Sequence, residues 1–76
     1  MFEREPITAE DARHVLWYFR QAGGCPPGGF TSYLLDAWGK ADTANQARLR
    51  MGFPSLGKAI DLARDMDFDA LRELAK

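Results

Sequence analysis

The segment from Gly23 to Gly29, with the sequence GGCPPGG, constrains the fold more than any other stretch of this chain. Its two adjacent prolines lack backbone N–H donors and cannot continue a helix, and its glycines let the chain change direction sharply. The segment therefore separates two structural elements. Two interpretations are open: a structural corner that joins two helices, or a loop that holds a ligand.

A phosphate-binding loop fits this segment poorly. Such a loop follows a strand and ends in Gly-Lys-Ser or Gly-Lys-Thr, whereas here Phe30 follows Gly29. The free N–H groups of a helix that begins near Thr31 still leave weak anion binding open. We favour the corner, in which the chain turns tightly and Phe30 is fixed as a hydrophobic plug. Thr31 then caps a second helix that packs against the first.

Apolar residues recur at helical spacing on both sides of this segment, and strand alternation is absent. Thr8 is a good N-cap, and we expect the first helix to end at Gly23 and Gly24 because glycine adopts the left-handed C-terminal conformation readily. Its apolar positions are Ala12, Val15, Leu16, Phe19 and Ala22. The second helix carries an apolar stripe of Leu34, Ala37, Trp38 and Ala41, widened by Tyr33 and Leu35.

Three further helices are indicated by their caps. Asp42 is an N-cap for a short helix over residues 43–51 that Gly52 closes, and Pro54 suits the first turn of the next helix. Asp67 caps a last short helix. The apolar positions of the last two helices are Leu56, Ala59, Ile60 and Ala63, then Phe68, Leu71 and Leu74. The sequence predicts an all-α fold, a compact orthogonal array of four to five short helices in a single domain over residues 1–76.

The cysteine content and the N-terminal residues indicate the cellular compartment in which we expect the protein to act. Cys25 is the only cysteine, so an intramolecular disulfide is impossible and a reducing, cytosolic setting is favoured. Residues 1–5 lack the basic start and apolar stretch of a signal peptide. No apolar run approaches the roughly 20 residues that span a bilayer. We expect a soluble, intracellular protein with no membrane association.

Charge is unevenly placed although the net charge is only −1. Residues 1–12 carry four acids against one base, residues 13–58 six bases against two acids, and residues 59–76 five acids against three bases. A dedicated nucleic-acid binder would show a stronger basic surplus. The candidate contacts for an anion or an acidic partner are Lys40, Asn45, Arg48 and Arg50, which could equally be ordinary solvent-facing residues.

No catalytic, cofactor or metal site is indicated by the sequence. His14 is the only histidine, and a pair with Cys25 is geometrically possible without a specific feature in its favour. Metal binding needs convergent ligands, and Asp61, Asp65 and Asp69 are better explained as a solvated acidic face. We therefore predict a non-enzymatic protein without a cofactor.

The aromatic run of Trp17, Tyr18 and Phe19 makes the first helix apolar on more than one face. Such a helix is either central in its fold or shared with a partner. Tryptophan and tyrosine are enriched at interface hot spots. The candidate partner surface consists of His14, Trp17, Tyr18 and Gln21, and the alternative is that these residues belong to the core.

The central stretch, from Gly28 to Ala63, resembles a family of small actinobacteriophage (mycobacteriophage-like) proteins. The resemblance is carried by Gly29-Phe30-Thr31, Ala41-Asp42, Asn45, Arg48-Leu49 and Gly52-Phe53-Pro54. It implies a phage origin and action in the cytoplasm of a bacterial host, and it implies no activity.

Together these observations predict a small phage-encoded protein-interaction module that binds a host or phage protein and can self-associate. The alternative is a nucleotide or nucleic-acid binder that uses the mildly basic central helix. Nucleic-acid binding should weaken steeply with added salt, which separates the two hypotheses.

Overall fold

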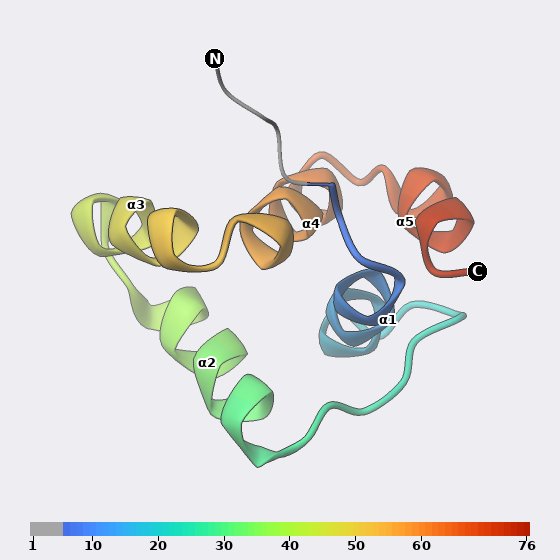
Figure 1. Ribbon diagram of the computed structural model, residues 1–76, viewed down its shortest axis with the longest axis horizontal. Coiled ribbons are helices and arrows are strands. Elements are labelled where there is room, and N and C mark those ends of the chain that lie inside the picture. The colour runs from blue at the N-terminus through green and yellow to red at the C-terminus, as the bar shows by residue number, and fades with distance from the viewer. Residues whose placement is uncertain (1–5) are drawn as a thin grey trace.

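A computed structural model describes residues 6–76, and five helices lie within them (Figure 1). They are α1 (Ala9–Tyr18), α2 (Gly29–Lys40), α3 (Thr43–Gly52), α4 (Pro54–Arg64) and α5 (Phe68–Leu74). The same residues contain no strand, so the predicted all-α array of short helices is confirmed. The acidic residues Glu3 and Glu5, together with Arg4, lie outside the described residues.

Helix α4 is the centre of the array. It packs against α1, α3 and α5, and α1 also packs against α5. Helix α2 lies beside α3 and reaches the core, which it shares with α1, through Leu35 and Trp38 (Figure 1). The second helix was expected to pack against the first; it packs chiefly beside the third and meets the first through a few side chains, Tyr18 among them. The long connection over residues 19–28 gives α2 the freedom to lie against α3 instead.

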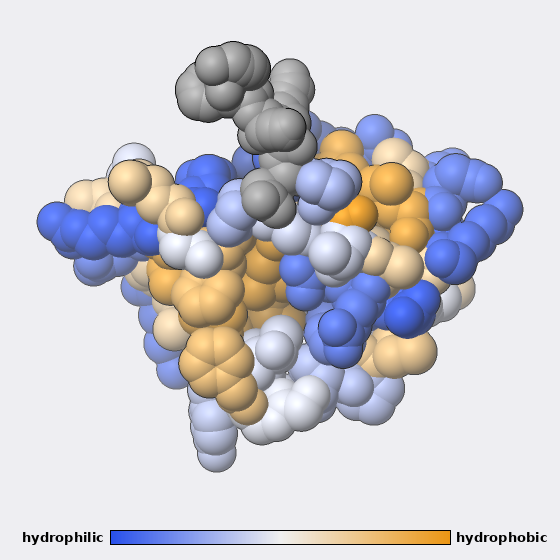
Figure 2. All heavy atoms as spheres, viewed as in Figure 1, coloured by the Kyte–Doolittle hydropathy of each residue, from blue (hydrophilic) through white to orange (hydrophobic). Residues whose placement is uncertain are grey.

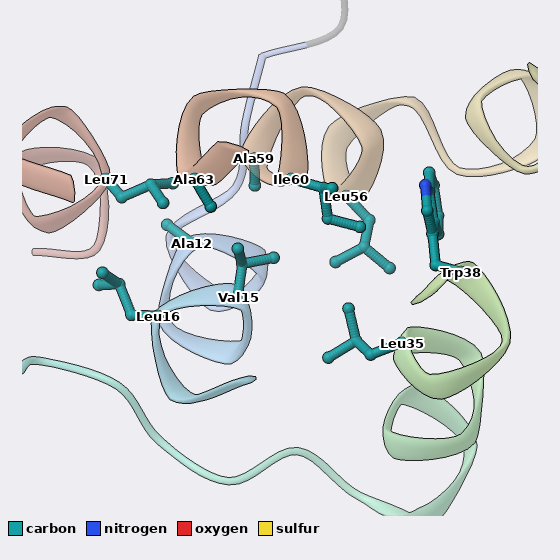
Figure 3. Close-up of a cluster of buried hydrophobic side chains, with 10 residues drawn as sticks. All are labelled: Ala12, Val15, Leu16, Leu35, Trp38, Leu56, Ala59, Ile60, Ala63 and Leu71. Carbon is teal, nitrogen blue, oxygen red and sulfur yellow. The ribbon is translucent and has the colours of Figure 1, made fainter. Parts of the chain in front are cut away.

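The buried side chains form one apolar cluster, with every buried residue of the described chain hydrophobic apart from Gly57 (Figure 3). Helices α1 and α4 supply seven of its members, α2 two and α5 one. They are Ala12, Val15, Leu16, Leu35, Trp38, Leu56, Ala59, Ile60, Ala63 and Leu71. Trp38 is the largest member, and its indole N–H is buried without a hydrogen-bond partner. Helix α3 contributes no fully buried residue.

Helix α1 begins as predicted and ends earlier than predicted. The Thr8 hydroxyl accepts a hydrogen bond from the Asp11 N–H at 3.1 Å, which confirms the cap. The helix ends at Tyr18, and Arg20 adopts a left-handed conformation with φ of 59°. The Gln21 N–H then donates to the Leu16 carbonyl at 2.8 Å, as in a Schellman motif. Because the helix ends here, the Phe19 ring can pack against the Phe68 ring of α5, with 6.3 Å between the ring centroids.

Helix α4 ends in the same way. Met66 has φ of 64°, its N–H donates to the Ala63 carbonyl at 2.9 Å, and the Asp67 N–H donates to the Leu62 carbonyl at 2.9 Å. Glycine normally occupies this left-handed position because a side chain raises its free energy. The two helix ends of this kind therefore carry local backbone strain at Arg20 and Met66.

The Gly–Pro segment, residues 23–29, runs back along α1 and is not a tight corner. The Cys25 N–H donates to the carbonyl of Arg13, which lies five residues before the end of α1, at 3.2 Å. A Cβ on Gly24 would lie 2.3 Å from the Trp17 backbone nitrogen, so only glycine fits this close approach. Gly23 is required for another reason, its φ of 94°. Residues 23–25 therefore lie against α1, whereas a Cβ on Gly28 or Gly29 would meet nothing within 4 Å.

Helix α2 begins at Gly29, two residues before the predicted start. Gly28 is the N-cap and has no side chain to offer, while its carbonyl accepts from the Ser32 N–H at 3.0 Å. Thr31 lies inside the first turn and is not the cap. Phe30 is 68% exposed, so its predicted role as a hydrophobic plug is wrong. Its ring lies at the surface, 6.1 Å from that of Phe53.

The last three helices match the predicted starts. Asp42 accepts from the Asn45 N–H at 2.8 Å, Pro54 occupies the first turn of α4, and Asp67 accepts from the Ala70 N–H at 3.4 Å. None of the helices within residues 6–76 has the length and apolar character needed to cross a membrane.

Candidate protein-interaction groove between helices α2 and α3

Helix α2 has two apolar faces. Leu35 and Trp38 point into the core from one face. Phe30, Tyr33, Ala37 and Ala41 follow one another at spacings of three or four residues and define the other face. Tyr33 is 77% exposed and Phe30 68%, and Ala37 is exposed as well. The predicted single stripe of this helix is therefore two stripes, and one of them faces solvent.

A groove of 540 Å³ lies between this outer face and α3. Its apolar lining comes from Ala37 and Ala41 near the end of α2, and from Leu49 and Phe53 at the end of α3. The exposed ring of Phe30 extends the apolar surface through its contact with Phe53. Figure 2 shows apolar residues gathered over α2 and the space between α2 and the α3–α4 junction, bordered by hydrophilic ones.

Three of the four predicted contact residues line this groove. They are Lys40 at the end of α2, and Asn45 and Arg48 on α3. The Arg48 guanidinium donates to the Asn45 side-chain oxygen at 2.8 Å, which orients it without neutralising it. Among the described residues neither Lys40 nor Arg48 forms an ion pair. The nearest carboxylate along the chain, Asp42, is engaged as the cap of α3. The groove therefore has an apolar lining and a positive rim.

Arg50, the fourth predicted contact, lies outside the groove lining and is used within the fold. Its guanidinium donates to both carboxylate oxygens of Asp61 on α4, from Nη2 to Oδ1 at 2.5 Å and from Nε to Oδ2 at 3.3 Å. This hydrogen bonding raises the pKa of Arg50; partial desolvation lowers it, and the charge of Asp61 adds to the increase. Arg50 therefore stays protonated and joins α3 to α4.

Gln46 links α3 to two other helices, and no motif in the sequence singles it out. Its side-chain N–H₂ group donates to the carbonyls of Trp38 and Ala41 at the end of α2, at 3.3 and 3.0 Å, and the Trp38 carbonyl also accepts from the Ala41 N–H. Its side-chain oxygen accepts from Arg64 of α4 at 3.0 Å. One glutamine thus ties α3 to the end of α2 and to α4, which holds the groove open.

Of the four residues predicted as a partner surface on the first helix, Trp17 and Tyr18 line one cleft. Trp17 is 39% exposed and borders a 320 Å³ cleft with Tyr18, Arg20, Ser32 and Asp36. Tyr18 is only partly exposed: its ring packs edge-on against Phe19 at 5.5 Å, and its hydroxyl lies close to Gly39 of α2. His14 and Gln21 are partly buried and do not line this cleft. The surface around Trp17 remains a prediction.

No hydrogen bond joins the side chains of His14 and Cys25. Cys25 is exposed, and the buried Nδ1 atom of His14 has no hydrogen-bond partner. Within residues 6–76, no group of three or more histidine, cysteine or carboxylate side chains is placed to hold a metal ion.

Comparison with protein-family models, with curated protein sequences and with solved structures found no match. The groove is therefore interpreted from its own geometry.

The aromatic members of the groove could have been found from the sequence. Phe30 and Phe53 stand at helix boundaries beside glycines, where a large apolar residue has few neighbours to cover it. The residues of the outer α2 face also recur at helical spacing. The sequence does not show on which side of α2 the helix α3 lies, because this depends on how the chain turns at Ala41.

Proposed function

We propose that this protein is a non-enzymatic interaction module that binds an acidic, apolar segment of a partner protein in the groove between α2 and α3. The observation that carries the proposal is the composition of the groove, with Leu49 and Phe53 in its lining and Lys40 and Arg48 on its rim. An amphipathic helix with leucines on one face and glutamates beside them complements both features. Docking of a helix into a hydrophobic groove is a common mode of peptide recognition.

The apolar lining supports a peptide more than a nucleic acid. Four of the seven lining residues are apolar, and Arg50 is already paired with Asp61. Two cations without acidic partners are few for a surface that follows a phosphate backbone. The alternative of nucleotide or nucleic-acid binding has one feature in its favour, since bases could stack on the exposed rings of Phe30 and Phe53.

A phage origin and action in the cytoplasm of a bacterial host belong to the same proposal. They are supported by the resemblance of the central stretch to actinobacteriophage proteins. Several residues of that resemblance line the groove: Ala41, Asn45, Arg48, Leu49 and Phe53.

The test uses two synthetic helical peptides that differ only in charge. One carries leucines on one face and glutamates beside them, and the other has lysines in place of the glutamates. We expect the acidic peptide to shift the NMR amide signals of residues 37–53, and the basic peptide to bind at least tenfold more weakly. Leu49→Asp and the double variant Lys40→Glu, Arg48→Glu should abolish binding, whereas Lys76→Glu, a matched charge reversal elsewhere, should not.

A single-stranded oligonucleotide is titrated in parallel. Oligonucleotide binding that falls steeply with salt and is lost in the Lys40→Glu, Arg48→Glu variant, with no peptide binding, would replace the proposal by its alternative. Peptide shifts confined to residues outside the groove would also overturn it.

A further inference from the structure

The turn between α4 and α5 carries an exposed apolar side chain surrounded by carboxylates. We call residues 65–69, with the sequence DMDFD, the Met66 tip. Met66 is 75% exposed, and Asp65, Asp67 and Asp69 are exposed as well. The backbone hydrogen bonds that end α4 hold Met66 in its left-handed conformation, so the side chain projects from a fixed position. Figure 2 shows an apolar patch over the α4–α5 region, separate from the one at α2.

The charge of the tip is negative and only partly compensated. Asp67 caps α5, and Asp69 pairs with the Arg72 guanidinium at 3.0 Å. Arg64, which precedes the tip, donates instead to Gln46 of α3. The five residues of the tip contain three carboxylates and no cation.

The tip and the groove are complementary. The groove offers an apolar lining and the cations Lys40 and Arg48, and the tip offers a projecting methionine between carboxylates. An unbranched methionine adapts readily to an irregular apolar surface. Figure 1 places the α4–α5 turn and the α2–α3 junction in different parts of the molecule. The Met66 tip of one chain can therefore reach the groove of a second chain more directly than the groove of its own chain.

We propose that the occupant of the groove is the Met66 tip of a second copy. This inference rests on the proposed function, because it names the partner of the same site. The surfaces in contact are different on the two copies, so the association is head-to-tail. Head-to-tail contacts generate closed rings or open filaments, depending on the rotation between neighbours.

The first experiment measures mass against concentration by sedimentation velocity. We expect the average mass of the 8.5 kDa chain to rise with concentration at low salt and to fall again as salt is added. Met66→Gly removes the projecting side chain and relieves the left-handed backbone, so it should weaken association at least tenfold without loss of folding. The matched control is Arg20→Gly, which relieves the same strain at the end of α1 and should leave association unchanged.

The second experiment reverses the charges of each surface. The groove variant carries Lys40→Glu and Arg48→Glu, and the tip variant carries Asp65→Lys and Asp69→Lys. Each should be monomeric alone, with helix content checked by circular dichroism. An equimolar mixture should associate again, because each reversed groove then meets a reversed tip and each native groove a native tip. Failure of the mixture to associate, with both variants folded, overturns the head-to-tail contact.

The outcomes separate this inference from the function on which it rests. A chain that stays at 8.5 kDa up to millimolar concentration, yet binds the acidic peptide in the groove, overturns the self-association and retains the proposed function. Association that Met66→Gly leaves unchanged overturns it as well. Association that needs both surfaces, without peptide binding, supports the head-to-tail contact and removes the proposal of a different partner protein. If neither association nor peptide binding is observed, both the head-to-tail contact and the proposed function are overturned.

Discussion

Helices α3 and α4 follow each other directly and have almost the same length, yet they are held in the fold by different forces. Helix α4 buries Leu56, Ala59, Ile60 and Ala63 in the core. Helix α3 buries no residue fully. It is attached through the cap at Asp42, the bonds of Gln46, the pair of Arg50 with Asp61 and the partly buried Leu49.

The difference shows why the candidate site lies on α3. A helix that supplies several core residues has its apolar positions covered, so few are left to contact a partner. Helix α3 is positioned by polar contacts at defined points, which leaves Leu49 and the adjacent Phe53 partly uncovered beside α2. The helix that contributes least to the core thus contributes most to the groove.

The largest expected effect is on the free energy of unfolding, when an apolar side chain that attaches each of the two helices to the fold is truncated. Ile60→Ala on α4 should lower the free energy of unfolding by about 2–5 kcal/mol, because it leaves a cavity in the core. Leu49→Ala on α3 should cost about 1–2 kcal/mol, because that side chain is only partly buried. Urea denaturation followed by circular dichroism measures both. If Ile60→Ala does not fold, Ile60→Val should cost about 0.5–1.5 kcal/mol. Equal losses at the two alanine variants would contradict the comparison.

The second prediction uses the two glycines near the α3–α4 junction. A Cβ on Gly57 would lie 2.7 Å from Cγ of Arg50 and 3.4 Å from the Trp38 ring, whereas one on Gly52 would meet nothing within 4 Å. Gly57→Ala should therefore destabilise by about 1–3 kcal/mol through overpacking, which exceeds the gain in helix propensity. Gly52→Ala should stabilise by up to about 1 kcal/mol. Thermal unfolding distinguishes the two variants. If Gly57→Ala stabilised the protein, the close packing of Arg50 of α3 against Gly57 of α4 would be contradicted.

The smallest expected effect on stability comes from Arg50 of α3, and we expect Arg48 of the same helix to affect peptide binding instead. Arg50→Gln should lower stability by about 0.2–1 kcal/mol, because the pair with Asp61 is partly exposed to solvent. The loss should shrink as salt is added, and peptide binding should be unchanged. Arg48→Gln should leave stability unchanged and weaken binding of the acidic peptide several-fold. Reversed behaviour of the two variants would place the binding surface on the α4 side of α3.

The pattern of caps and apolar spacing predicted four to five helices, and the structure has five within residues 6–76, four of which start where they were expected. It failed at the end of α1 and the start of α2, which border the Gly–Pro segment. The prediction placed the end of α1 at Gly23, because glycine is the usual residue there, but Arg20 takes the left-handed conformation instead. Tertiary packing outweighed local preference here, since the earlier end brings Phe19 against Phe68.

The groove was predicted in part. Lys40, Asn45 and Arg48 were expected to contact an acidic partner or an anion, and they meet at one surface. The binding face expected on the first helix stays a prediction, in which Tyr18 packs partly against the core and Trp17 is exposed. Helical periodicity identifies an apolar position without showing whether another element covers it.

The sequence by itself determined the helices, because caps, prolines and apolar spacing act within a few residues of the chain. It also determined the composition of the Met66 tip, a contiguous run of residues. Tertiary structure alone decided that α2 lies beside α3, that Arg50 pairs with Asp61 of α4, and that Leu49 and Ala37 line the same groove. These contacts join residues far apart in the chain, and their free energy depends on how the whole core packs.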